Sequence, residues 1–290
     1  MQQGVCLKIP PVTIRIQSPV AAVSRSIWQL YADYTMASLS AKQFADFHIR
    51  IARPVGLRYW YKPQALFYFD NRQPFKPLPY SQAFPFFEWG LNWCIAQHIY
   101  KFLIIHSAVV VKNDLALLLS GYPGAGKSTL CAALINRGWR LLSDEMAIVD
   151  LSNAQLLPLV RPVSLKNQAI DIIRQFAPRA QIGELFLDTA KGTVAHLKPP
   201  AESVTQCEKR ATARWIVFPK YQDGAETRLV PVSKGRALLR LAENSFNYNV
   251  IGRQGFEVLC DLLEQCDSYD FCYSRLDEAV ELFSELAESQ

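Results

Sequence analysis

Alternating apolar and polar positions in the first quarter of the chain predict β-strands. Residues 12–16 and 47–51 place apolar side chains at every second position, the period of a strand with one buried face. Residues 65–69 form another apolar run, which ends at Asp70-Asn71, a pair that favours a turn. We therefore expect residues 1–78 to form a smaller N-terminal α+β region.

A proline-rich connector and an aromatic helix follow this region. Four prolines interrupt the pattern: Pro74, Pro77, Pro79 and Pro85. Such interruptions are typical of a boundary between structural units. Residues 86–100 are rich in aromatic side chains and favour a helix whose aromatic residues, including Trp89, pack into the core. We assign residues 79–105 to this connector and helix.

A long apolar stretch opens the remainder of the chain. Residues 115–119 are uninterrupted apolar positions, as in a strand that is buried on both faces. A turn at Asn113-Asp114 joins them to a second predicted strand, residues 107–112. Beyond a glycine-rich loop, apolar positions with helical spacing predict a helix that ends at Arg137-Gly138.

Short strands then follow one another instead of alternating with helices. The apolar runs predict strands at residues 139–142, 146–150, 155–159, 194–197 and 215–218. Residues 167–176 favour a helix. The acidic C-terminal tail is predicted to be helical, with a capping box formed by Ser274 and Asp277. We therefore predict an α/β fold with a mixed β-sheet, and a second domain over residues 106–290.

Composition and charge exclude several classes of protein. The net charge of +5 is too small to indicate nucleic-acid binding. Seven cysteines without a Cys-x2-Cys pair argue for reduced thiols and against a zinc site. No segment is apolar enough to span a membrane, and residues 1–4 lack the start of a signal peptide. We expect a cytoplasmic protein that binds neither nucleic acid nor membrane.

The glycine-rich loop has the Gly-x4-Gly-Lys-Ser spacing of a Walker A motif, or P-loop. Its residues are Gly121, Tyr122, Pro123, Gly124, Ala125, Gly126, Lys127, Ser128 and Thr129. Glycines let successive backbone N–H groups face a phosphate. Lys127 would bind the outer phosphates, and the Ser128 hydroxyl would bind Mg²⁺. Because a predicted strand precedes the loop and a helix follows it, we expect ATP to bind here with Mg²⁺.

Two adjacent carboxylates form a second candidate element. Asp144 and Glu145 follow a predicted strand, 17 and 18 residues after Lys127. Side chains at the carboxyl ends of strands face the ligand crevice of an α/β sheet. A carboxylate there binds Mg²⁺ or accepts the proton of a hydroxyl that is being phosphorylated. The short interval favours a kinase over a transport or mechanical ATPase.

The succession of these elements resembles the HPr kinase/phosphorylase family, in particular its HPr-kinase-related kinase A branch. The resemblance rests on residues 106–107, 121–129, 136–142, 144–145, 161–167 and 191–200. It implies a P-loop core akin to phosphoenolpyruvate carboxykinase and a kinase that phosphorylates a serine hydroxyl. By this resemblance Asp144 is the general base, Glu145 the second acid with a metal-binding role, and His106 a residue near the transferred phosphate.

The chain departs from the founding members in two places. Glu145 stands where they have a second aspartate, and residues 183–186 do not reproduce their Glu-x-Arg-Gly-x-Gly signature. We therefore expect phosphorylation without efficient phosphorolysis. Four further residues have both a functional and a structural interpretation. Arg161 and Lys166 are either phosphate contacts or surface residues, Lys191 could belong to an anion-binding turn, and His196 is favoured as a core residue.

Together these patterns predict an ATP-dependent kinase that transfers the γ-phosphoryl group to a hydroxyl. The expected acceptor is a serine of a small protein or peptide. Two alternatives stay open at this point: a small-metabolite P-loop kinase, and a nucleotide-gated binding module with little turnover. The sequence leaves the oligomeric state open, with a homo-oligomer as one option.

Overall fold

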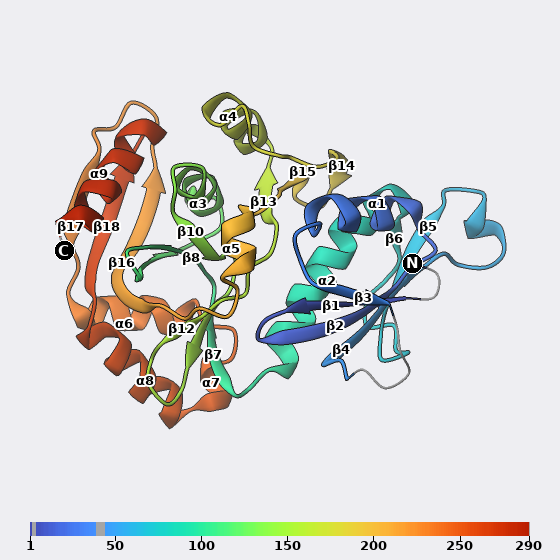
Figure 1. Cartoon of the computed structure of the whole chain (residues 1–290), viewed down its shortest axis with the longest axis horizontal. Coiled ribbons are helices and arrows are strands. Elements are labelled where there is room, and N and C mark those ends of the chain that lie inside the picture. Colours follow the sequence, from blue (N-terminus) through green and yellow to red (C-terminus); the bar gives the residue numbers. More distant parts are fainter. Residues whose placement is uncertain (2–3, 39–43, 290) are drawn as a thin grey trace.

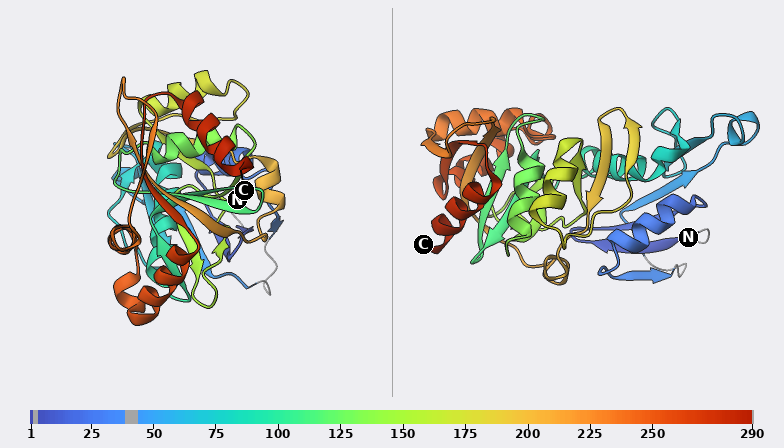
Figure 2. Two further views of the ribbon diagram at one scale, coloured as in Figure 1. Left: turned by 90° about the vertical axis from the view of Figure 1, so that its left-hand side faces the viewer. Right: turned by 90° about the horizontal axis from the view of Figure 1, so that it is seen from above.

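The computed structural model describes residues 1, 4–38 and 44–289 and shows a mixed α/β protein (Figure 1). Gln2 and Gln3, part of the N-terminal segment considered above, lie outside the described residues. The molecule is elongated, with the two ends of the chain near opposite ends of its long axis (Figure 2). Its two six-stranded sheets each combine parallel and antiparallel strand pairs, as the sequence predicts, whereas its two three-stranded sheets are antiparallel.

The first sheet is built from the N-terminal part of the chain, in the order β3-β1-β2-β4-β5-β6. Its strands are β1 (Val5–Ile9), β2 (Val12–Gln17), β3 (Met36–Ser38), β4 (Phe47–Ala52), β5 (Gln64–Phe69) and β6 (Leu78–Pro79). The two strands predicted from alternation are confirmed as β2 and β4, and the apolar run at residues 65–69 is confirmed as β5. The predicted turn is also present, since Asp70 and Asn71 have φ values of 45° and 64°.

Helix α2 (Ala83–His98) packs against this sheet together with α1 (Ala21–Leu30), which the sequence pattern did not reveal. Helix α2 begins three residues earlier than predicted, because Pro85 is tolerated in the first turn of a helix, where its missing N–H needs no partner. The assignment of Trp89 to the core is wrong: its side chain is 43% exposed. The connector also contains the short helical turn η2 (Tyr80–Gln82) and the end of β6, whereas the turn η1 (Leu57–Tyr59) lies in the N-terminal region.

The second large sheet has the order β10-β8-β9-β16-β18-β17. Its strands are β8 (Ser107–Lys112), β9 (Leu115–Ser120), β10 (Arg140–Ser143), β16 (Thr212–Tyr221), β17 (Arg228–Pro231) and β18 (Asp267–Tyr273). β9 and β16 run parallel, as do β16 and β18, whereas the remaining pairs are antiparallel. The hairpin of β8 and β9 turns at Asn113 and Asp114, as predicted.

Helices cover both faces of this sheet. Leu117 and Leu119 of β9 share a core with α3 (Lys127–Ile135) and α9 (Leu276–Glu288). Ala116 and Leu118 point to the other face and pack with the helices of the segment that follows β17. That segment contains α6 (Lys234–Glu243), α7 (Tyr248–Ile251) and α8 (Arg253–Glu264). Because both faces are buried, residues 115–119 of β9 are all apolar.

The C-terminal tail corrects two predictions. It is not wholly helical, since β18 inserts into the sheet between β16 and β17. The capping box is also absent: α9 begins after Arg275 without a side-chain cap, and the Ser274 hydroxyl donates to the Ala225 carbonyl at 2.8 Å. The Ser274 hydroxyl therefore binds a residue distant in the chain instead of capping α9.

Two smaller sheets lie between the large ones. They are ordered β12-β11-β7 and β13-β15-β14. Their strands are β7 (Phe102–Ile105), β11 (Ala147–Asp150), β12 (Leu156–Leu157), β13 (Val163–Lys166), β14 (Phe186–Thr189) and β15 (Gly192–Leu197), accompanied by α4 (Gln168–Phe176) and α5 (Ala201–Thr205). The predicted strands and helix in this stretch are confirmed. Within the described ranges, no helix has the length and apolar character needed to cross a membrane.

Candidate active site

The glycine-rich loop connects β9 to α3 and depends on three glycines with positive φ. Gly121, Gly124 and Gly126 have backbone φ values of 136°, 85° and 93°, which residues other than glycine rarely adopt. At Gly126, a Cβ atom would also lie 2.5 Å from the Tyr273 hydroxyl oxygen. That hydroxyl donates a hydrogen bond to the Gly126 carbonyl at 3.2 Å. The strand β18 therefore supports the end of the loop.

Lys127, the first residue of α3, places its ammonium group inside the curve of the loop. Nζ donates hydrogen bonds to the carbonyl oxygens of Gly121 and Tyr122, the latter at 3.0 Å. The side chain is buried, and burial lowers its pKa. Lys166 adds to this effect on the pKa, whereas Asp144 opposes it. The loop thus encloses a cation at the N-terminal end of a helix.

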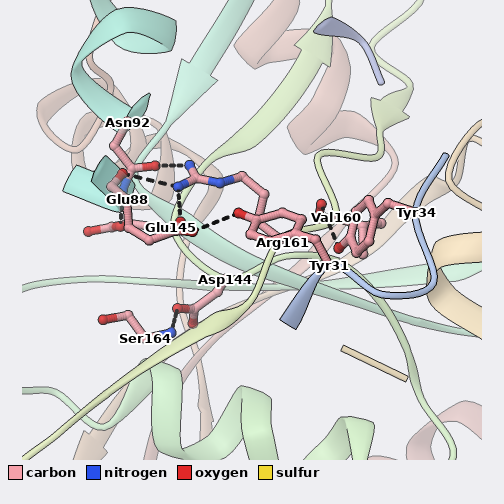
Figure 3. Close-up of polar contacts among 9 residues, drawn as sticks. All are labelled: Tyr31, Tyr34, Glu88, Asn92, Asp144, Glu145, Val160, Arg161 and Ser164. Atoms are coloured by element: carbon pink, nitrogen blue, oxygen red, sulfur yellow. Dashed lines mark hydrogen bonds and ion pairs between the residues drawn. The ribbon is translucent and has the colours of Figure 1, made fainter. Parts of the chain in front are cut away.

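Asp144 lies in the bend after β10 and is buried. Oδ2 accepts a hydrogen bond from the backbone N–H of Ser164 at 2.8 Å (Figure 3). Oδ1 is also buried and makes no hydrogen bond to any described residue. Burial and the neighbouring Glu145 raise the Asp144 pKa to about 6, against the opposing effects of Ser164 and the Ser128 hydroxyl. The structure therefore brings Ser128 of the loop and Asp144 together.

Glu145 is held by a network from the N-terminal part of the chain. Asn92 on α2 donates from Nδ2 to Glu145 Oε2, and its Oδ1 accepts a hydrogen bond from Arg161 (Figure 3). Arg161 also pairs with Glu88, whose other oxygen accepts a hydrogen bond from Tyr31 at 2.8 Å. No sequence pattern had linked residues of α2 to the acidic pair.

Electrostatics set the charge of Glu145. Burial raises its pKa, but the cations Lys191, Lys166 and Arg161 outweigh burial, and the net effect lowers the pKa. Glu145 is therefore held as a carboxylate, whereas its neighbour Asp144 has a raised pKa. Two adjacent acids with pKa values shifted in opposite directions are suited to different roles.

His106 lies between β7 and β8, close enough to Lys127 and Glu145 to interact with both charges. Burial, reinforced by Lys127, lowers the pKa of the imidazole. Nδ1 is buried and has no hydrogen-bond partner in the described part of the chain. The ring packs edge-on against Phe246, with ring centroids 5.5 Å apart. A neutral imidazole is thus placed beside the candidate site.

A cavity of about 400 Å³ adjoins the two carboxylates. Asp144 and Glu145 line it, together with Lys166, Lys191 and side chains of α2 and β6. None of the loop residues Gly121–Thr129 is among the residues that line it. The acidic pair therefore lies between the loop, which Asp144 meets through Ser128, and this cavity.

Three of the residues with alternative interpretations can now be assigned. Arg161 is neither a surface residue nor free for a phosphate, because it is buried and paired with Glu88; this pairing outweighs burial and raises its pKa. The anion-binding turn at Lys191 is wrong, since its amide donates to Thr189 Oγ1 at 3.1 Å and the Thr193 amide to Asn167 Oδ1 at 3.0 Å.

The core assignment of the third residue, His196, is confirmed. The ring is buried edge-on against Phe84, with centroids 5.1 Å apart, and burial lowers its pKa to about 4. Lys166, in contrast, lines the cavity beside the acidic pair, so its role as a phosphate contact stays open.

The oxygen donors at this position are of the kind that Mg²⁺ prefers. Ser128, Asp144 and Glu145 supply a hydroxyl and two carboxylates, and Asp144 Oδ1 is a buried oxygen without a partner among the described residues. Within the described ranges, no cluster of three or more His, Cys, Asp or Glu side chains is arranged to hold a metal ion. Mg²⁺ sites commonly combine one or two carboxylates with phosphate oxygens and water.

Comparison with known proteins supports the predicted relationship. The chain is 22% identical, over 217 residues, to the HPr kinase/phosphorylase of Nitrosomonas europaea, an alignment that covers 71% of this chain. The chain is related to the HPr kinase/phosphorylases. It spans 65% of that relative's length. No protein-family model matches the chain.

A solved structure of the Hpr(Ser) kinase/phosphatase from Coxiella burnetii also matches. The match covers 64% of this chain and 99% of the other, at 14% sequence identity and a TM-score of 0.29. A TM-score of this size is too low to establish a shared fold.

Proposed function

We propose that this protein is an ATP-dependent, Mg²⁺-requiring kinase that phosphorylates a serine of a small protein or peptide. The observation that supports this most directly is the position of Asp144. Its Oδ1 is buried and has no hydrogen-bond partner among the described residues, and the carboxylate meets the glycine-rich loop through Ser128 and also lines the cavity. A base between a phosphate-binding loop and an acceptor cavity is the arrangement that phosphoryl transfer requires.

The loop residues would bind the nucleotide. Backbone N–H groups between Gly121 and Thr129 would face the phosphates, helped by the positive N-terminal end of α3. Lys127 would exchange its bonds to the Gly121 and Tyr122 carbonyls for phosphate oxygens. Ser128, Asp144 and Glu145 would hold Mg²⁺, which neutralises charge on the phosphates when bound.

The reaction we propose is an in-line displacement. The serine oxygen forms a bond to the γ-phosphorus, the bond from phosphorus to the β,γ-bridging oxygen breaks, and ADP leaves. The serine proton moves to Asp144. A pKa of about 6 makes Asp144 a stronger base than an ordinary aspartate while leaving it ionised at neutral pH. Neutral His106, beside Lys127, would then contact the transferred phosphoryl group.

The proposal extends to the organisation of the protein. Residues 1–78 would form the N-terminal domain, residues 79–105 the connecting segment, and residues 106–290 a P-loop kinase domain of the HPr-kinase type. The site would work in the cytoplasm. Asn92 lies in the connecting segment yet binds Glu145, and Glu88 of the same segment pairs with Arg161. We therefore infer that the kinase domain depends on this segment.

A labelling experiment tests the function. The protein is incubated with ATP labelled at the γ-phosphate, with Mg²⁺ and with candidate acceptors, beside a Lys127→Ala variant as control. Label in a protein or peptide supports the proposal, whereas label in a small hydroxy compound identifies a metabolite kinase. A metabolite kinase is the second candidate function, because the cavity volume lies within the usual range for small ligands. Nucleotide binding without label transfer would indicate a binding module instead.

A further inference from the structure

We propose that the cavity beside Asp144 binds the acceptor as an extended peptide segment, in which the serine neighbours an apolar residue and an acidic group. This inference rests on the proposed kinase function and names its substrate class. It follows from how the cavity is covered, from the apolar side chains of its wall, and from two lysines whose ammonium groups have no hydrogen-bond or ion-pair partner among the described residues.

Access to Asp144 favours a flexible segment over a folded surface. The carboxylate is only 7% exposed, and it lines a cavity that is also bounded by α2, β6 and the hairpin of β14 and β15. A serine on a rigid protein surface would meet these elements before its hydroxyl reached Oδ1. An extended chain can insert one side chain, and a cavity of about 400 Å³ accommodates a few residues.

The wall that α2 and β6 contribute is mostly apolar, and its polar residues Asn92 and Glu88 are already bound to Glu145 and Arg161. Leu78, Phe86 and Trp89 line the cavity on this side, and Met146 faces them from the bend after the acidic pair. The Trp89 ring stacks on Phe86, with centroids 6.1 Å apart, yet remains 43% exposed. A large aromatic side chain that is fixed by packing but open to a cavity is suited to binding an apolar residue.

Two lysines would select an acceptor that carries a negative charge. Lys166 and Lys191 line the cavity, and both act on the carboxylate of Glu145. Within the described part of the chain, neither ammonium group makes a hydrogen bond or ion pair, whereas nearby Arg161 is paired with Glu88 and Lys198 with Asp33. Lys166 lies close to Lys127 and Asp144, where the phosphoryl group would pass.

Lys191 lies in the turn between β14 and β15, and we assign it the acidic group of the acceptor. Among the described residues, no carboxylate of the cavity forms an ion pair with it: Glu88 is paired with Arg161, Glu145 acts on it only at longer range and belongs with Asp144 to the proposed metal site, and Asp188 is exposed. The acidic group is either an Asp or Glu side chain or the C-terminal carboxylate of the segment, because both present the same charge to the ammonium.

The test uses peptide libraries with a fixed serine and varied neighbours. One arm varies acidic, neutral and basic side chains with an amidated C-terminus, and a second compares free with amidated C-termini. Phosphorylation from γ-labelled ATP is measured for the wild type, for Lys191→Glu and for Trp89→Ala. Lys234→Glu, exposed on α6 and outside the cavity, is the matched charge control.

We expect the wild type to prefer acidic over basic neighbours by about tenfold, with Lys191→Glu removing or reversing that preference. Trp89→Ala should raise the KM of peptides with a large apolar neighbour and leave that of alanine peptides unchanged. Lys234→Glu should match the wild type. Phosphorylation without charge preference, or of folded proteins only, would overturn this inference and leave the proposed function standing. Phosphorylation of small hydroxy compounds only would overturn both. Failure of the wild type to bind or use ATP would instead overturn the proposed function.

Discussion

Asn92 of α2 binds Glu145 of the acidic pair through its amide nitrogen and accepts a hydrogen bond from Arg161 at its amide oxygen (Figure 3). The two residues are 53 positions apart in the chain. Arg161 fixes which way the amide faces, because a guanidinium only donates hydrogen bonds and must meet the oxygen. The nitrogen is thereby turned toward Glu145, so α2 orients a carboxylate of the candidate active site.

Asn92→Ala should raise the Mg²⁺ concentration needed for half-maximal activity several-fold, because Glu145 loses the donor that orients it. ATP affinity should change little. The measurement is kinase activity over a Mg²⁺ titration, with Asn249→Ala on α7, an exposed position, as the control. An unchanged Mg²⁺ requirement in Asn92→Ala would show that the hydrogen bond has no positioning role.

Lys127→Ala should reduce phosphoryl transfer on the order of 100-fold or more, since a cation at the developing charge contributes several kcal/mol to the barrier. The fold should be retained, because the partners that remain, the Gly121 and Tyr122 carbonyls, belong to a loop that reaches solvent. Circular dichroism and thermal unfolding provide the control. Activity equal to the wild type would contradict the nucleotide assignment.

The two acids should have separable effects. Asp144→Asn is expected to keep ATP affinity within a few-fold but to lower kcat strongly, because the proton acceptor is lost. Glu145→Gln should instead raise the Mg²⁺ requirement. Steady-state kinetics at several Mg²⁺ concentrations distinguish the two effects. Exchange of the two phenotypes would mean that the roles of the two acids are reversed. If both variants kept wild-type activity, the assignment of this strand end to the active site would be contradicted.

Activity should fall at acid pH with a midpoint near 6. Burial raises the Asp144 pKa to about 6, so the base is protonated below this pH and ionised above it. Bound Mg²⁺ favours the charged carboxylate, and raising its concentration should therefore move the midpoint to lower pH. A profile of kcat/KM against pH at two Mg²⁺ concentrations measures this. A midpoint near the ordinary aspartate value at low Mg²⁺ would rule out Asp144 as the base.

Arg161→Met should destabilise the protein by about 3–5 kcal/mol, because it leaves the Glu88 carboxylate buried without its cation. Adding Glu88→Gln in the same chain should recover roughly half of the loss, since a neutral amide is less costly to bury. Urea unfolding measures both variants. Lys8→Met, which breaks the exposed pair with Glu208, is the control and should have little effect. If the double variant recovers no stability, the loss in Arg161→Met comes from lost packing and not from the unpaired charge of Glu88.

The local elements of the site could be predicted from the sequence because they depend on neighbouring residues. The apolar run of β9, the glycines of the loop and the apolar face of α3 are set by strand and helix periods and by the backbone freedom of glycine. The position of Asp144 and Glu145 at a strand end follows from the same local pattern. These features alone placed a loop, a helix and two carboxylates in order.

The tertiary structure decided what surrounds them. Arg161 and Glu88 are 73 residues apart, and β18 reaches β16 only after three helices have intervened. Periodicity shows which face of an element is apolar, but not which distant element covers it, and a charged residue gives no sign of whether its partner is water or a buried carboxylate. The network around Glu145, the support of Gly126 by Tyr273 and the cavity all depend on such long-range contacts.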